Sequence, residues 1–140
     1  MRTVHQIVFV VAAVTLMSAM HTGRLFAQDD VRRTLVGTWE GTVFQGSASG
    51  PVRLDFSEKD GKLLWTWRWQ ASFGSGEAEG IVTKYAPPTV ELRGRYTVHP
   101  SINVRGSTIN MILTVSGASL KGDGLTDAID QPFTLSMAKK

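Results

Sequence analysis

Cysteine is absent from this chain, and histidine is scarce. The 140 residues include no Cys and only three His. The lack of cysteine excludes disulfides, a cysteine nucleophile, cysteine-bound metal and lipid attachment to an N-terminal cysteine. Two of the histidines, His5 and His21, lie near the N-terminus. The rest of the chain keeps only His99, so histidine-based metal sites and Ser-His-Asp catalysis lack the partners that they need.

The N-terminal segment has the layout of an export signal. Arg2 precedes a mostly apolar run from Ile7 to Met20, and this run is shorter than the roughly 20 apolar residues of a membrane-spanning helix. The segment ends at Ala27, directly before an acidic stretch. This layout predicts a secretory signal peptide over residues 1–27. Cleavage after Ala19 and an uncleaved membrane anchor are the alternatives.

Residues 28–140 are predicted to form one domain that is exported to a bacterial-type periplasm or secreted. An exported domain without disulfides must be held together by its core alone, which fits a bacterial periplasmic or secreted protein better than a small extracellular module. We expect no membrane contact after the signal has been removed. The loss of Arg2 and Arg24 would lower the net charge from +3 to +1, because residues 1–27 contain no acid. So small a charge gives no support for nucleic-acid binding.

Aromatic residues are concentrated in one short stretch. Trp65, Trp67 and Trp69 alternate with polar residues, and a β-strand would place all three indoles on one face. At roughly 150–250 Å² per indole and about 25 cal/mol per Å², their burial is worth on the order of 10 kcal/mol. The stretch therefore predicts a strand whose indoles face a core. The same face could also line a ligand cavity or form an exposed platform.

Seven further stretches have strand character, and segments rich in Gly, Ser, Pro and Asp separate them. Short strands at near-regular spacing predict an all-β domain, an eight-stranded antiparallel up-and-down β-barrel. A β-sandwich is the alternative. The predicted strands cover 35–44, 52–57, 63–70, 78–85, 89–98, 108–115, 120–125 and 133–137, and the longer loops cover 45–51, 72–76, 99–106 and 127–132.

Gly37-Thr38-Trp39, at the start of the first predicted strand, resembles the G-x-W signature of lipocalins and other calycin barrels. In that family the Trp closes one end of an eight-stranded barrel and often packs against a basic residue from a late strand. This sequence has no matching Arg in a late strand, and the only basic residues near the last predicted strand are Lys139 and Lys140. Leu92-Arg93-Gly94-Arg95-Tyr96 is similar to a stretch of avidins, but the later Trp of that family is missing. The resemblance implies a calycin-like barrel and a small apolar ligand, without biotin binding.

We expect a small apolar or aromatic molecule to bind, without catalysis, inside this barrel. Glycines within strands, such as Gly80 and Gly94, could leave space for it, or could accommodate the large indoles and the coiling of a barrel. The second interpretation is favoured. No cofactor or metal is predicted. The candidate interior residues are Trp65, Trp67, Trp69, Phe56, Leu92, Tyr96 and Met111.

Two other classes of function stay open. A solidly packed barrel could grip a protein partner through its loops, for instance as an inhibitor, with Phe73 as the apolar anchor. An enzyme is less favoured; its candidate acids are Glu77 with Glu79, and Asp127 with Asp130. His99 is expected to lie exposed in a loop and to have no role. Arg68, Arg93, Arg95 and Arg105 could form a basic patch for an anionic ligand, but an ordinary solvated face is the favoured interpretation.

Overall fold

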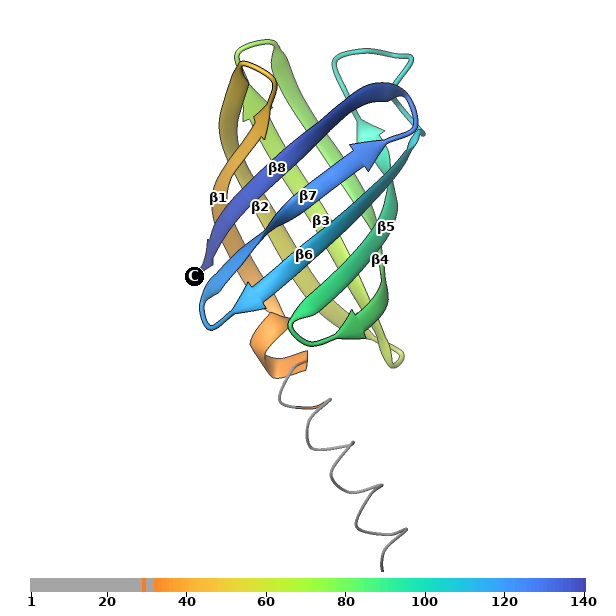
Figure 1. The fold of residues 1–140 in the computed structure, drawn as a ribbon. Helices are drawn as coiled ribbons and strands as arrows, with labels where there is room; N and C mark the ends of the chain where they lie inside the picture. Colours follow the sequence, from red (N-terminus) through yellow and green to blue (C-terminus); the bar gives the residue numbers. More distant parts are fainter. Residues whose placement is uncertain (1–28, 30–31) are drawn as a thin grey trace, which may run out of the picture. The chain divides into compact units, whose positions relative to one another are not determined.

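Eight antiparallel strands form one closed barrel in the computed structural model, which describes residue 29 and residues 32–140 (Figure 1). Each strand pairs with its neighbours in the sequence, and β1 also pairs with β8. The predicted up-and-down barrel is confirmed, and the sandwich alternative is wrong because this last pairing closes the sheet. The strands are β1 (Gly37–Gln45), β2 (Ala48–Lys59), β3 (Lys62–Ala71), β4 (Gly74–Ala86), β5 (Thr89–Val98), β6 (Thr108–Ser116), β7 (Ser119–Thr126) and β8 (Ile129–Lys139).

The barrel belongs to a compact unit that comprises Leu35–Lys140. The predicted signal peptide over residues 1–27 lies outside the described residues. A short helical segment at 32–35 comes before β1 in the chain. Within the part of the chain that the structure describes, no helix is long and apolar enough to span a membrane.

Strand β3 carries the row of indoles into the barrel. Trp65, Trp67 and Trp69 are buried, whereas the polar residues between them face solvent. On the neighbouring strand β2, Phe56 lies opposite Trp65, and Leu54 lies opposite Trp67. Alternate residues of the two strands therefore pack into one shared core. The strand and its buried face, both predicted from the alternation, are confirmed.

Several connections are shorter than the sequence predicted. Segments 45–51, 72–76 and 127–132 were expected as loops, but only residues 46–47, 72–73 and 127–128 lie between strands. Strand β2 continues through Gly50 and Pro51, which pair with Val43 and Thr42 of β1. Pro51 has no counterpart in β3, whose register with β2 begins at Val52, so its missing N–H costs no hydrogen bond there. The predicted starts of these strands were therefore too late, because the composition of their first residues is typical of loops.

Three glycines in the strands lie beneath aromatic rings. A Cβ atom at Gly76 would overlap the ring of Trp69, one at Gly94 would overlap Trp65, and one at Gly124 would overlap Phe133. A side chain at any of these positions would force a large ring to move in a closely packed interior. The glycines thus accommodate aromatic rings, which agrees with the favoured interpretation from the sequence.

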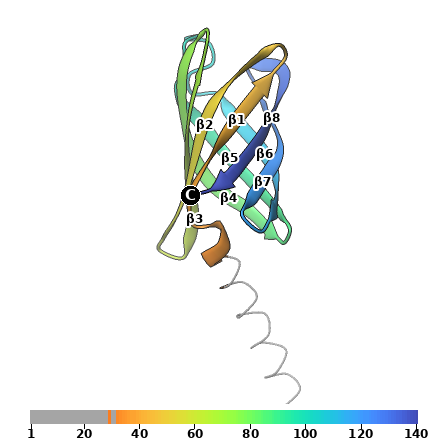
Figure 2. The same ribbon diagram turned by 90° about the vertical axis from the view of Figure 1, so that its left-hand side faces the viewer.

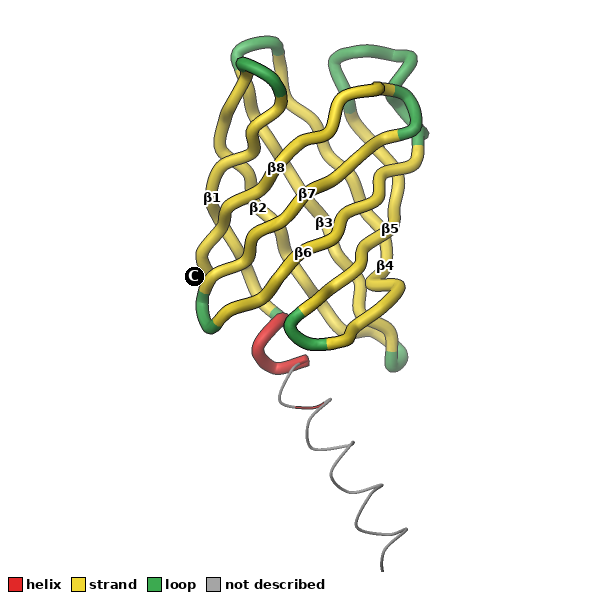
Figure 3. Tube along the Cα trace, in the orientation of Figure 1, coloured by secondary structure: helices red, strands yellow, loops and turns green. Residues whose placement is uncertain are grey.

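Successive turns alternate between the two ends of the barrel (Figure 3). We call the end with turns 46–47, 72–73 and 127–128 and loop 99–107 the open end. The opposite end, with turns 60–61, 87–88 and 117–118, is the closed end.

The closed end is sealed by Trp39, which is fully buried. Its Nε1 donates a hydrogen bond to the carbonyl oxygen of Leu35 over 2.9 Å. Strand β8 runs beside β1 (Figure 2), and the Nζ atom of Lys139 lies 5.6 Å from the centre of the Trp39 ring. A lysine of the last strand thus lies over the Trp of the Gly37-Thr38-Trp39 motif, where the sequence has no matching Arg.

Candidate functional site

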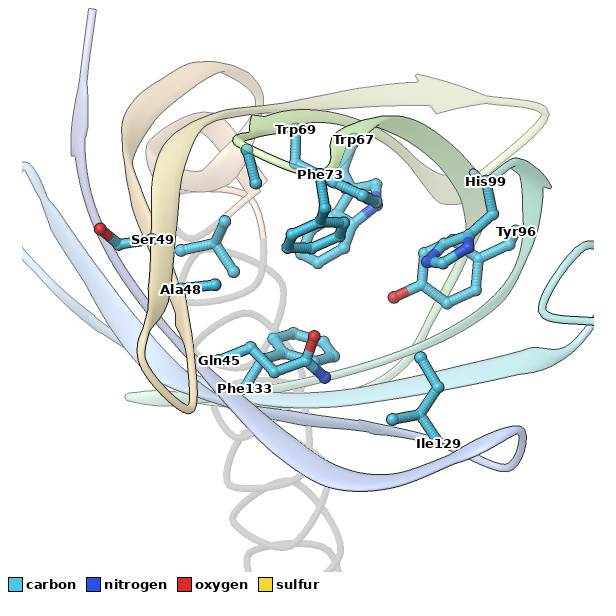
Figure 4. Close-up of a pocket in the computed structure, with 12 residues that line it drawn as sticks. Gln45, Ala48, Ser49, Trp67, Trp69, Phe73, Tyr96, His99, Ile129 and Phe133 are labelled. Atoms are coloured by element: carbon cyan, nitrogen blue, oxygen red, sulfur yellow. The ribbon is translucent and has the colours of Figure 1, made fainter. Parts of the chain in front are cut away.

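A small hollow lies at the open end of the barrel (Figure 4). Its walls come from the ends of five strands, from turn 72–73 and from His99 of loop 99–107, because the up-and-down order brings these segments to the same end. None of the lining residues is Lys, Arg, Asp or Glu. The lining residues are Val43, Gln45, Ala48, Ser49, Trp67, Trp69, Ala71, Phe73, Tyr96, His99, Ile129 and Phe133.

Six aromatic rings surround this hollow, and we call them the aromatic cup. Each ring lies beside the next, with centroid separations between 5.1 and 6.3 Å. All five pairs are tilted or edge-on, the arrangements that aromatic quadrupoles favour. In order of contact, the rings belong to Phe133, Trp67, Tyr96, His99, Trp69 and Phe73.

Trp67, one of the residues that line the hollow, has a polar atom without a hydrogen-bond partner. Among the described residues, its Nε1 is the only fully buried side-chain nitrogen or oxygen that makes no hydrogen bond. The indoles deeper in the barrel differ, because Trp39 donates to Leu35 and Trp65 donates to the carbonyl oxygen of Ile81 over 3.0 Å. An unsatisfied buried donor costs about 1–3 kcal/mol. Trp67 thus lines the hollow and carries an N–H group that no other group of the described chain satisfies.

Tyr96 contributes a second polar group to the cup. Figure 4 shows its hydroxyl directed toward the middle of the hollow. Burial raises the pKa of Tyr96 above its ordinary value, since ionisation is costly in an apolar environment. The hydroxyl therefore stays protonated and can donate a hydrogen bond.

His99 contributes a third polar group, and its ring is buried at 7% exposure. The backbone N–H of Ser101 donates to its Nδ1 over 3.0 Å, so the proton of the neutral imidazole is assigned to Nε2. Burial lowers the pKa of His99 below 6.5, and the positive charge of Arg105 acts in the same direction. The ring is therefore neutral at pH 7.

The expectation that His99 would be exposed is wrong, because loop 99–107 folds back onto the end of β5. The N–H of Gly106 donates to the carbonyl oxygen of Tyr96 over 2.8 Å. Arg105 Nε donates to the carbonyl oxygen of His99 over 3.0 Å, and Val104 is buried at the centre of the loop. These contacts hold the imidazole against Trp69 and Tyr96.

The cavity inside the cup is small, at about 30 Å³. A buried water needs roughly 10–15 Å³ on this measure, whereas pockets that enclose a drug-sized molecule measure roughly 300–1,000 Å³. The cavity can therefore enclose a group of only a few atoms. Any larger remainder of a ligand would lie in the mouth, where Phe73 is 52% exposed.

The structure brings together three of the seven predicted site residues. Trp67, Trp69 and Tyr96 line the hollow. The other four are buried in the packed core and are not among the lining residues: Trp65, Phe56, Leu92 and Met111.

Sequence reasoning missed Phe133, Ile129 and His99 as members of the site. Phe133 alternates with Leu135 and Met137, so its inward direction was readable from the sequence. Its contact with Trp67 was not readable, because β8 and β3 are far apart in the chain and meet only across the closed barrel.

None of the acids proposed for catalysis lines the hollow. Glu77 Oε1 is 3.2 Å from Arg68 Nε on the outer surface, and Glu79 lies opposite Arg95. These acids of β4 thus lie between Arg68 of β3 and Arg95 of β5, and Arg105 bonds to the carbonyl oxygen of His99. Asp127 Oδ1 accepts a hydrogen bond from the N–H of Thr108 over 2.9 Å. Within residues 32–140, no group of three potential metal ligands occurs.

No family model, curated protein or solved structure matches this chain. The barrel order and the contact between Lys139 and Trp39 are compatible with a calycin-like fold.

Proposed function

We propose that this protein is an exported, non-catalytic binding protein for a small, largely apolar molecule, held at the open end of its barrel. The aromatic cup carries this proposal, because six rings surround a hollow whose lining has no charged residue. Ligand pockets are typically apolar with a few convergent polar groups. Here those groups are the indole N–H of Trp67, the hydroxyl of Tyr96 and the imidazole of His99, together with the side-chain amide of Gln45, whose Nε2 already donates to the carbonyl oxygen of Gln131. Export rests on the pattern of residues 1–27.

The size of the cavity favours binding in the mouth over enclosure deep in the barrel. Only about 30 Å³ is free within the cup, so most of a ligand would contact Phe73 and Trp69 at the rim. The rings of these two residues lie 5.4 Å apart. Phe73 belongs to the short turn 72–73 and is half exposed, so a change of its rotamer would enlarge the mouth. Side-chain changes of this kind are common on binding.

Fluorescence titration with N-phenyl-1-naphthylamine, a neutral aromatic probe, tests the proposal directly. We expect saturable binding with a blue shift in probe emission, and transfer of excitation from Trp67 and Trp69. Phe73→Ala should weaken binding about three- to tenfold, because one aromatic contact is worth about 0.5–1.5 kcal/mol. Native mass spectrometry of protein taken from its exported compartment would detect a ligand that is retained from the cell.

Phe44→Ala is the matched control, since Phe44 is similarly exposed at 46% but does not line the hollow. This variant should bind the probe as the wild type does. Absence of saturable binding, together with the bare polypeptide mass, would contradict the proposal. Equal losses in the two variants would place the probe on the outer surface and would also contradict it.

A second candidate function is docking of a protein partner on the open end. Three exposed apolar side chains at this end favour it: Phe73, Val98 at 43% and Ile102 at 74% exposure. Exposed apolar residues that gather in one region often mark interaction sites. Ile102→Ser should abolish capture of a protein from the exported fraction but leave binding of the aromatic probe unchanged. Unchanged capture of the protein by the Ile102→Ser variant would contradict this candidate.

A further inference from the structure

We infer that the ligand carries an uncharged hydrogen-bond acceptor of the carbonyl class, which receives the N–H of Trp67 at the base of the cup. This inference rests on the proposed binding function and specifies the chemistry of its ligand. Trp67 lines the cavity, is only 2% exposed, and has a buried Nε1 atom with no hydrogen-bond partner. An indole nitrogen donates and cannot accept. The group opposite it must therefore be an acceptor.

The Tyr96 hydroxyl and the His99 imidazole could donate further hydrogen bonds to the carbonyl oxygen of the ligand. The Tyr96 ring lies 6.3 Å from the Trp67 ring, and its hydroxyl is directed into the hollow (Figure 4). A carbonyl oxygen has two lone pairs and can accept hydrogen bonds from two donors. His99 Nε2–H is a further donor, because Nδ1 is already occupied by the N–H of Ser101. The cup thus combines several donors with an apolar wall.

The absence of charge in the lining favours a neutral acceptor over a carboxylate. None of the twelve lining residues is Lys or Arg, so a buried carboxylate would lose its hydration without gaining a counter-charge from the wall. Burial of an unpaired charge is far more costly than burial of a hydrogen-bonded neutral group. Lowering of the His99 pKa by burial also keeps that ring uncharged at neutral pH.

The volume of the cavity limits the part of the ligand that enters it. About 30 Å³ suffices for a group of a few atoms, such as an acetyl or formyl group. The remaining body must lie along Trp69 and Phe73, whose rings form the rim. We therefore expect a ligand with a small carbonyl end and a flat apolar body, of which acetophenone is the simplest probe.

A pair of isosteric probes tests the role of the carbonyl oxygen. Acetophenone and α-methylstyrene have the same shape, but the second has a methylene group in place of the oxygen. The wild-type protein, labelled with ¹⁵N, is titrated with each probe while the indole N–H signals are followed by NMR. The signals of Trp39 and Trp65 serve as internal controls, because both N–H groups already have partners in the barrel.

We expect acetophenone to bind about three- to tenfold more tightly than α-methylstyrene, the ratio that one net hydrogen bond supplies. The Trp67 N–H signal should move downfield with acetophenone and not with α-methylstyrene, while those of Trp39 and Trp65 stay in place. Benzoate should not bind. Equal affinity of the two neutral probes, or an unchanged Trp67 signal at saturation, would overturn the inference but leave the proposed binding function intact.

A substitution provides a second test. Trp67→Phe removes the N–H group and should bring the affinity for acetophenone down to that for α-methylstyrene. If this variant does not fold, the wild-type NMR titration decides alone. Failure of both neutral probes and of N-phenyl-1-naphthylamine to bind the wild type would overturn the proposed function as well, so the two failures are distinguishable.

Discussion

Both ends of this barrel contain a buried indole, but the two ends differ in how far the aromatic side chains are covered and in whether the indole N–H is hydrogen-bonded. At the closed end, Trp39 is completely buried, its N–H is bonded to Leu35, and Lys139 covers its ring. At the open end, the N–H of Trp67 has no partner and Phe73 is half exposed. An indole thus closes one end of this barrel with its polar atom satisfied, and another lines the hollow at the other end with its polar atom unpaired.

The difference between the ends arises from the segments that cover them. The segment before β1 supplies a backbone carbonyl and the buried side chain of Leu35 to the closed end. The open end carries only short turns and loop 99–107, and this loop folds back onto the end of β5 through the bond from Gly106 to Tyr96. The hollow therefore lies at the end whose mouth is left uncovered.

The largest expected effect is loss of stability from Trp39→Ala. Removing a fully buried aromatic side chain costs about 3–5 kcal/mol through lost burial and the resulting cavity, so urea-induced unfolding should shift to much lower denaturant concentration. Phe73→Ala should cost less than about 1.5 kcal/mol, because half of its side chain already faces water. Similar free energies of unfolding for the two variants would show that the two ends are equally well sealed.

A smaller effect is expected from pH, and it is specific to the open end. The pKa of His99 is lowered below 6.5 in the folded state, so the unfolded chain takes up a proton more readily. The stabilising contribution of the neutral ring is complete above pH 6.5 and is lost as the pH falls through the lowered folded value. The melting temperature should therefore decrease between pH 7.5 and pH 5 by circular dichroism.

His99→Asn is the control for this pH effect. Asparagine can accept the N–H of Ser101 but does not titrate, so the melting temperature of this variant should change less over the same pH range. An unchanged pH dependence would assign the effect to other groups. The affinity of the wild type for the aromatic probe should also decrease as the pH falls, because protonation of His99 would break its bond to Ser101 and place a charge in the cup.

The smallest effect is expected at the closed end from Lys139→Gln. A cation over a Trp face is worth about 0.5–1 kcal/mol at a partly exposed site, so the free energy of unfolding should fall by about this amount. Binding of the aromatic probe should not change, since Lys139 lies far from the lining of the open end. A change in probe affinity would indicate that the two ends are coupled.

Much of the fold could be predicted from local patterns. The alternation of Trp65, Trp67 and Trp69 identified a strand with one buried face, and the spacing of such stretches predicted eight strands in a closed meander. The starts of β2, β4 and β8 were misplaced because Gly, Ser and Pro occur both in loops and in strands whose edges tolerate them. Composition alone cannot separate these two cases.

The candidate site was only partly predictable. Trp67, Trp69 and Tyr96 were predicted as interior residues, and they line the hollow. Interior residues share a cavity only if they lie at the same level along the barrel axis and face one another across the interior. Both conditions depend on how the strands pair, which local sequence patterns do not show. His99 was misassigned for a related reason, since its burial comes from a loop that folds back through Arg105 and Gly106.

The sequence by itself determined the class of the protein: an all-β domain with a row of buried indoles and a Trp at the start of its first strand. These features follow from side-chain alternation and from the large free energy of burying indoles, both of which are local properties. Only the tertiary structure decided that Phe133 would meet Trp67 and that one indole N–H would stay unpaired. It also decided which end of the barrel would stay open, because these outcomes depend on contacts between strands far apart in the chain.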